Sequence, residues 1–218
     1  MLITCIGHAS FLLEMECGLR ILFDPYDASC GYPVLHTPAD VVLASHRHHD
    51  HHAVETVPGT PRIIDRAGEY DLASGVKLTA IRAWHDDAQG ALRGETLLFL
   101  LEGEGLRVAH LGDLGHLPGA EQVSALSPVD VLMIPVGGHY TIGAEDAART
   151  AMLLEARVIL PMHYRTKANQ DWPITPVEDF TRLYAPDEAE TLPLLRVCRE
   201  DLSCQPKVAV LSPLSLKK

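Results

Sequence analysis

One loop of the chain gathers side chains that can bind metal ions. Residues 45 to 52 read SHRHHDHH, so eight positions hold five of the twelve histidines and one aspartate. In an extended segment alternate side chains share a face, so His46 and His48 can point the same way. Where the chain then turns, Asp50 and His51 can project beside them. Imidazole nitrogens and carboxylate oxygens are ligands of zinc-like cations, so the spacing predicts two adjacent metal pockets.

Single polar residues at the ends of three expected strands can complete these pockets. His85 follows the run VKLTAIRAW, Asp113 ends LRVAHLGD and His163 follows RVILPM. Each alone is also explained as a polar residue that caps a strand, and the histidine loop alone as a surface segment without metal. Together the four segments supply six or seven ligands, which is enough for two metal ions.

The flanking sequence predicts the elements that position these residues. Short strands dominate the first half of the chain, and strands alternate with helices in the second half. This pattern favours sheets sandwiched between helices in one α/β domain that spans residues 1–218. The expected strands cover residues 2–6, 10–15, 20–25, 41–45, 62–65, 76–84, 95–102, 106–113, 129–136, 157–164, 192–197 and 207–213. The expected helices cover residues 120–126, 144–156 and 176–185.

The composition is that of a soluble protein with a sizeable core, since 47% of residues are hydrophobic and 22% are charged. A net charge of −11 without any Lys/Arg run argues against nucleic acid as a partner. A small anionic substrate is still compatible if metal ions supply local positive charge. No apolar stretch approaches the roughly 20 residues that cross a bilayer, so no membrane partner is expected.

Cysteine usage indicates a reducing compartment. The five cysteines form no CxxC pair, and an odd number cannot all pair within one chain. Reduced thiols in the cytoplasm are the simplest interpretation. The sequence does not decide between a monomer and a homo-oligomer.

The motifs in series resemble a known family. HxHxDH at positions 46 to 51, followed in order by a histidine, an aspartate and a late histidine, is similar to the metallo-β-lactamase-fold hydrolases. The phrases GHASFLLE, ILFDP, IPVGGHYTIGAEDAA and VILPMHYRT resemble the branch of ascorbate-6-phosphate lactonase and related metal-dependent hydrolases. The resemblance spans residues 2 to 167, and residues 168 to 218 carry no motif that can be placed.

The resemblance implies a four-layer αββα sandwich with a metal site on loops at one edge of the sheets. It also implies that Asp113 bridges two divalent metal ions. One metal would be held by His46, His48 and His85, and the other by Asp50, His51 and His163. Zinc is the usual metal of the family, with manganese or iron in some members, and nitrogen and oxygen ligands do not select among the three.

Two residues are expected to support the ligands from behind. Metal-bound histidines usually donate their second ring nitrogen to a carboxylate, carbonyl or water. Asp24, in the ILFDP strand, is a natural acceptor beneath the histidine loop, and the family pattern also places an acid there. His8 in GHAS could play a similar part, but we favour a structural role for it.

Further side chains could line the mouth of the site. The two glycines of the GGHY segment permit a close backbone approach, so His139 and Tyr140 could reach a substrate or donate a proton. His116, close after the aspartate of LGD, could face the same cleft. Arg165 and Lys167 could attract an anionic group. For each of these residues, an exposed loop side chain is the competing interpretation.

Three functions are compatible with such a site. The first is a hydrolase in which two metals bridged by Asp113 convert a water into a hydroxide that attacks an ester, lactone or phosphoester. In that scheme Asp50 assists proton transfer while it binds metal. The second is an iron-dependent redox enzyme that acts on oxygen or sulfur species. The third is a metal-binding module without catalysis, which the complete set of seven ligands disfavours.

Overall fold

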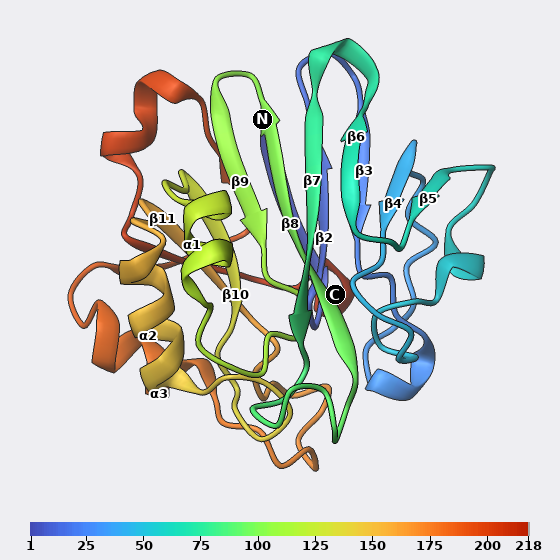
Figure 1. Ribbon diagram of the computed structural model, residues 1–218. Helices are drawn as coiled ribbons and strands as arrows, with labels where there is room; N and C mark the ends of the chain where they lie inside the picture. The colour runs from blue at the N-terminus through green and yellow to red at the C-terminus, as the bar shows by residue number, and fades with distance from the viewer. Residues whose placement is uncertain (218) are drawn as a thin grey trace.

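Two β-sheets lie face to face in the computed structural model, which describes residues 1–217 (Figure 1). The smaller sheet has six strands in the order β13-β1-β2-β3-β4-β5. Its first three strands in sequence form the expected antiparallel meander, and β3, β4 and β5 then run parallel. The strand bounds are β1 (Leu2–Gly7), β2 (Ser10–Glu14), β3 (Arg20–Phe23), β4 (Val41–Leu43), β5 (Arg62–Ile64) and β13 (Leu195–Arg196).

The larger sheet has eight strands in the order β12-β14-β11-β10-β9-β8-β7-β6. Strands β6 to β9 form an antiparallel meander, and β9 to β11 are parallel, as are β11, β14 and β12. The bounds are β6 (Gly68–Asp71), β7 (Lys77–Trp84), β8 (Glu95–Gly103), β9 (Leu106–His110), β10 (Val131–Pro135), β11 (Val158–Met162), β12 (Ala189–Leu192) and β14 (Val208–Leu211).

Three α-helices cover the outer face of the larger sheet (Figure 1): α1 (Ala120–Leu126), α2 (Ala144–Leu153) and α3 (Val177–Tyr184). Alanines of α2 and Phe180 of α3 are buried against this face. The outer face of the smaller sheet is covered by loops and two short 3-10 turns, Ala28–Cys30 and Val54–Thr56. The predicted α/β sandwich is confirmed, with loops in place of helices on this one face.

The main core fills the space between the sheets. In β3 and β4 alternate residues point to opposite faces, so Ile21 and Phe23 enter the inter-sheet core while Leu22 packs under the outer loops. Phe23 meets Phe99 of the opposite sheet, with ring centroids 6.1 Å apart in an edge-on arrangement. Burying such a side chain contributes roughly 1.5–3 kcal/mol, so this layer holds the two sheets in register.

The carboxyl ends of several strands meet at one edge of the sandwich. Strands β3 and β4 are parallel, as are β9, β10 and β11. Strand β7 runs in the same direction as β9, because both are antiparallel to β8, which lies between them. Residues that follow these strands are therefore brought together although they are far apart in sequence.

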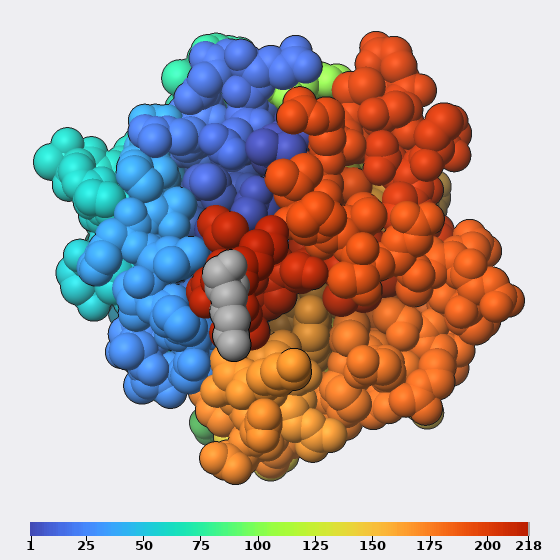
Figure 2. All heavy atoms as spheres, turned by 180° about the vertical axis from the view of Figure 1, so that it is seen from behind, coloured from blue at the N-terminus to red at the C-terminus, as the bar shows by residue number. Residues whose placement is uncertain are grey.

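The C-terminal part of the chain, which carries no recognisable motif, adds strands to both sheets. Strand β13 pairs with β1, whereas β12 and β14 extend the larger sheet beyond β11. Figure 2 shows the C-terminal residues (red) lying between the N-terminal segment (blue) and the orange segment that follows β11. Within the described residues, none of the helices has the length and apolar character that a membrane span requires.

The departures from the predicted elements have simple causes. Strands β6 and β12 are mostly exposed edge strands with the sequences GEYD and AETL, which lack an apolar alternation and depend on pairing with a neighbour. The strand expected over 106–113 ends at His110 because the chain turns through Gly112, whose φ is 48°. The strand expected over 192–197 is reduced to Leu195–Arg196.

Candidate metal centre

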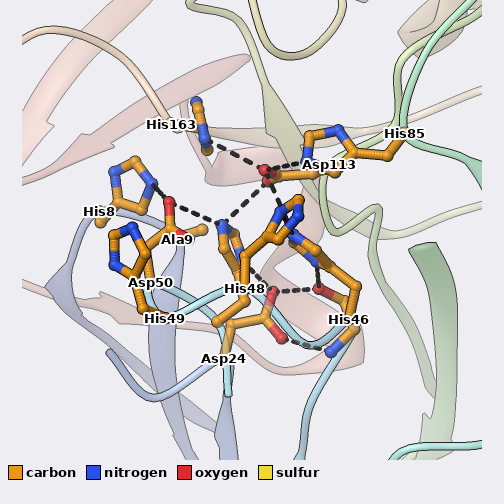
Figure 3. A network of polar contacts seen from close by, with 12 residues as sticks. His8, Ala9, Asp24, His46, His48, His49, Asp50, His85, Asp113 and His163 are labelled. Atoms are coloured by element: carbon orange, nitrogen blue, oxygen red, sulfur yellow. Dashed lines mark hydrogen bonds and ion pairs between the residues drawn. The ribbon is translucent and has the colours of Figure 1, made fainter. Parts of the chain in front are cut away.

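The histidine loop leaves the end of β4 and lies over the edge where the strand ends meet. His85 directly follows β7, Asp113 follows β9 after a short turn, and His163 directly follows β11. Figure 3 shows these side chains converging with those of the loop around Asp113. The structure therefore brings together all seven predicted metal ligands, which fall into two donor sets.

The outer set consists of His46, His48 and His85, whose donor atoms all lie within 4.8 Å of one another. Nε2 of His46 is 2.9 Å from Nδ1 of His48. The ring of His85 stands close to both, with centroids 4.7 Å from His46 and 5.1 Å from His48. His46 and His85 are buried, whereas His48 is exposed to solvent.

The inner set consists of Asp50, His51 and His163, and the structure adds His8 to it. The four donor atoms again lie within 4.8 Å of one another, and all four residues are buried. Nε2 of His8 is 3.4 Å from Oδ2 of Asp50, and its ring centroid is 4.2 Å from that of His163. Sequence reasoning favoured a purely structural His8, but its side chain lies among the donor atoms.

Asp113 lies between the two sets. Its Oδ2 is 3.2 Å from Nε2 of His85 and 3.2 Å from Nε2 of His163. Its Oδ1 is 3.2 Å from Nε2 of His51. Burial alone would raise the pKa of Asp113, but His163 and His51 lower it well below its ordinary value. One ionised carboxylate is thus shared by histidines of both sets.

Asp24 and Ser45 orient two histidines from behind. Asp24 accepts hydrogen bonds through Oδ1 from the Ser45 amide (2.7 Å) and through Oδ2 from the Ser45 hydroxyl (2.8 Å). Nδ1 of His51 donates to Oδ2 of Asp24 at 2.7 Å. Because the Ser45 hydroxyl has given its hydrogen to Asp24, it accepts from Nδ1 of His46 at 2.9 Å. In the neutral rings, both Nε2 atoms therefore present lone pairs to the cluster.

These lone pairs provide a test of whether the residues suit a metal. Nε2 of His51 and Oδ1 of Asp113 are both buried and have no hydrogen-bond partner among the described residues, although they face each other. Burial would lower the pKa of His51, yet Asp113, Asp50 and Asp24 raise it well above its ordinary value. A positive charge between the two atoms is favoured, and a divalent cation would supply it. The donors are nitrogen and oxygen atoms only, which fit zinc, manganese or iron.

Backbone strain also concentrates at the cluster. Eight residues other than glycine have positive φ in the described chain, and three of them are His8 (54°), Asp24 (43°) and His163 (53°). Such conformations cost of order 1–3 kcal/mol in unfavourable cases and persist where surrounding contacts impose them. They turn the chain sharply at strand ends, which directs these side chains toward the cluster.

A cavity of about 320 Å³ opens directly onto both donor sets. His48, Asp50 and Asp113 lie in its wall on the metal side. Arg93, Tyr140 and Trp172 also line the cavity, and the Trp172 ring lies 5.2 Å from that of His8. Its size is at the lower end of the range for small-molecule sites. Sequence reasoning missed Arg93 and Trp172: Arg93 lies in a polar loop, and Trp172 lies in the segment without a motif.

The remaining candidates are placed outside the cluster. His139 is exposed and packs edge-on against Tyr140, so Tyr140, rather than His139, lines the cavity. His116 uses both ring nitrogens locally, since Nε2 accepts from the Trp84 amide and Nδ1 contacts the Leu117 carbonyl. It lines a separate pocket. Arg165 and Lys167 were predicted to attract an anionic group. Both are exposed, and neither lines the cavity.

Comparison with known proteins now identifies the family. The family model for the beta-lactamase superfamily domain matches residues 2–163. The chain belongs to this superfamily. A UPF0173 metal-dependent hydrolase from Thermococcus onnurineus is 30% identical, over 86% of this chain and 93% of the relative. A second one, from Carboxydothermus hydrogenoformans, is 32% identical, over 80% of this chain and 87% of the relative.

A solved structure from Thermotoga maritima is also similar to this chain. It is described as a candidate Zn-dependent hydrolase of the metallo-β-lactamase superfamily, is 41% identical, and covers 96% of this chain and 97% of its own with a TM-score of 0.79. The resemblance to the metallo-β-lactamase-fold hydrolases and to related metal-dependent hydrolases is therefore confirmed, as is the metallo-β-lactamase fold. The prediction of a metal-dependent hydrolase is confirmed at the level of the family.

Proposed function

We propose that this protein hydrolyses a small ester, lactone or phosphoester with two divalent metal ions held on either side of Asp113. The observation that carries the proposal is the shared carboxylate, whose oxygens lie 3.2 Å from histidine nitrogens of both donor sets. A carboxylate with histidines on both sides suits two cations better than one. The family membership and the metal-dependent hydrolases among the relatives support the same function.

Each of the two metals is assigned to its own group of side chains. One metal is assigned to His46, His48 and His85, and the other to Asp50, His51 and His163, as the resemblance implied. Asp113 belongs to both sets. Asp24 and Ser45 hold the rings of His51 and His46 so that their lone pairs face inward. His8 stands beside Asp50 and restricts that carboxylate to the cluster side.

Bound divalent metals supply Lewis acidity and lower the pKa of a coordinated water toward 7. The chain itself supplies the shape of the site and a route for the proton. Asp50 lies in the cavity wall, so a carboxylate oxygen is available there to accept a proton from water and return it to a leaving group. Tyr140 and Trp172 line the same cavity, and their rings would limit the water that surrounds a bound substrate.

The dimensions of the cavity restrict the substrate. About 320 Å³ accommodates a small molecule. The net charge of −11 also disfavours polyanions such as nucleic acids. We therefore propose a small-molecule substrate, with zinc as the first metal to test and manganese and iron as the alternatives.

The test begins with metal content. Protein purified without a histidine tag or chelator is analysed by plasma mass spectrometry, and then assayed with chromogenic phosphodiester, lactone and thioester substrates. About two equivalents of zinc or manganese together with hydrolysis of one class are expected. Two irons with a visible absorption band would instead favour the redox enzyme. Metal without any hydrolysis across the panel would count against the hydrolase.

A pair of variants from the same loop provides the control. His48→Ala removes a donor of the outer set, and hydrolysis and metal content are both expected to fall. His52→Ala removes a histidine that lies 3.5 Å from Asp65 and outside both donor sets. It should retain both metals and the activity. Equal losses of metal and activity in the two variants would show that His48 is wrongly assigned as a metal ligand.

A further inference from the structure

Arg93 lies at the point where the cavity over the donor sets meets a second, larger groove. It is half-buried and lines both hollows, as does His48. The groove has a volume of about 520 Å³ and also contains Arg47, Arg66 and Arg82. Two acidic residues, Asp65 and Glu95, accompany these four arginines. In a chain with a net charge of −11, this wall is a local concentration of positive charge.

Most of the other arginines in the groove already have partners. Arg47 pairs with Asp65 at 2.9 Å, and Arg82 pairs with Glu95 at 3.5 Å. Arg93 forms no ion pair and no side-chain hydrogen bond with any residue in the described part of the chain. Its guanidinium carbon instead lies 5.6 Å from the ring centroid of Tyr140. Five donor hydrogens are therefore available at the mouth of the site.

The loop that carries Arg93 is held in a fixed conformation. Asp86, next to the donor His85, is buried and accepts hydrogen bonds from the backbone amides of Ala88, Gly90, Leu92 and Arg93 at 2.8–2.9 Å. Four such bonds to one carboxylate fix the turn between β7 and β8. The stacking on Tyr140 then fixes the direction of the arginine side chain.

We propose that Arg93 is a specificity-determining residue that binds an anionic oxygen group, a carboxylate or a phosphate, on the substrate of this site. The inference rests on the hydrolase proposed above. A half-buried arginine without a carboxylate partner, pre-oriented by an aromatic face, suits bidentate recognition of a planar or tetrahedral oxyanion. The metals would act on the scissile bond while Arg93 holds a charged group at the cavity wall. Neutral esters of the same length are then poorer substrates.

The direct test measures binding to the metal-loaded protein. Benzoate and phenyl phosphate are titrated by calorimetry into the wild type, Arg93→Gln and Arg93→Lys. Arg93→Gln removes both the charge and the guanidinium fork, whereas Arg93→Lys keeps the charge and removes only the fork. We expect binding of the preferred ligand to weaken by about 10- to 100-fold in Arg93→Gln and by less in Arg93→Lys, the scale for a hydrogen bond to a charged group. The ligand that loses more affinity identifies the anion.

A charge-matched control comes from the same groove. Arg82→Gln removes one positive charge, but Arg82 is already paired with Glu95 and is largely exposed. It should leave the affinity for both ligands within about 2-fold of the wild type, since exposed pairs contribute little. Equal affinities in the wild type and Arg93→Gln, or equal losses in Arg93→Gln and Arg82→Gln, would overturn the proposal.

Kinetics provide an independent measurement. 4-Nitrophenyl hexanoate and mono-4-nitrophenyl adipate have the same leaving group and chain length and differ in a terminal carboxylate. Arg93→Gln should raise KM for the adipate ester by about 10-fold or more and leave KM for the hexanoate ester nearly unchanged. If the wild type binds both anions through Arg93 but hydrolyses no substrate, the proposed hydrolase is refuted and the anion site is supported. Hydrolysis with no dependence on Arg93 would refute the anion site alone.

Discussion

The outer and inner donor sets each take two residues from the same loop but differ in their surroundings. The outer set has three imidazoles and no carboxylate of its own, and His48 reaches solvent. The inner set includes Asp50, is buried throughout, and contains His51, whose ring is fixed by Asp24. A step of two positions along the chain, from His48 to Asp50, therefore separates an accessible set of neutral ligands from a buried set that includes a carboxylate.

This difference has a consequence for metal binding. One ring is oriented from behind in each set, but the inner set has an additional negative ligand and is buried throughout, so it should bind its metal more tightly. The exposed His48 loses conformational freedom when it binds, which weakens the outer set. We therefore expect the outer metal to leave first under a chelator, and mutations to affect the two sets unequally.

The largest effect is expected where the two sets meet. Asp113→Asn retains the shape of the side chain but removes the negative charge that both sets share. We expect hydrolysis to fall by roughly 100-fold or more, the scale for loss of a central electrostatic contact. Metal content should fall from about two equivalents to one or fewer, measured by plasma mass spectrometry. Two retained metals with normal turnover would contradict the bridging role of Asp113.

The next test compares the two sets directly. His163→Ala removes a buried donor of the inner set, and His48→Ala removes the exposed donor of the outer set. His48→Ala should lose one metal readily and retain the inner one during dialysis against a weak chelator. His163→Ala should weaken the tighter site and affect folding more, because it leaves a cavity beside His8 and Trp172. Identical curves of metal release for the two variants would mean that the outer and inner sets do not differ in affinity.

A smaller effect is expected from the residue behind the inner set. Asp24→Asn keeps the size of the side chain but weakens the bond that orients His51. Loss of such a contact typically costs about 10- to 100-fold in metal affinity or activity. Competition with a fluorescent chelator measures the affinity, and added metal should restore part of the turnover. An unchanged affinity would mean that the His51 ring is held by other contacts.

The smallest effect is expected from His139→Ala. The side chain is exposed and lies outside both donor sets, although the GGHY segment made it a candidate for proton transfer. Activity and metal content should stay within about 2-fold of the wild type, as for most exposed positions. Tyr140→Ala in the same turn is the matched variant, and its larger effect on KM would confirm that Tyr140 is the member of this pair that contacts substrate.

Local sequence predicted most of the elements but not the edges of the sheets. Apolar runs such as VDVLMIPV form buried central strands whatever their neighbours, so β10 and the helices near it were predictable. Strands β6 and β12 have no such pattern, because they lie at the edges of the sheet with mostly exposed side chains and are identified only by their pairing with β7 and β14. Whether such a segment becomes a strand depends on the neighbouring strand with which it pairs, and the local sequence does not specify that neighbour.

The sequence by itself was enough to predict seven candidate donor residues, because HxHxDH is followed by a histidine, an aspartate and a histidine at strand ends, all with nitrogen or oxygen donor atoms. Tertiary structure decided which side chains join them. It brought His8 into the inner set, left His116 and His139 outside the cluster, and placed Trp172 and Arg93 in the lining of the cavity. Spacing along a strand fixes which residues share a face, whereas contacts between distant loops depend on how the two sheets pack.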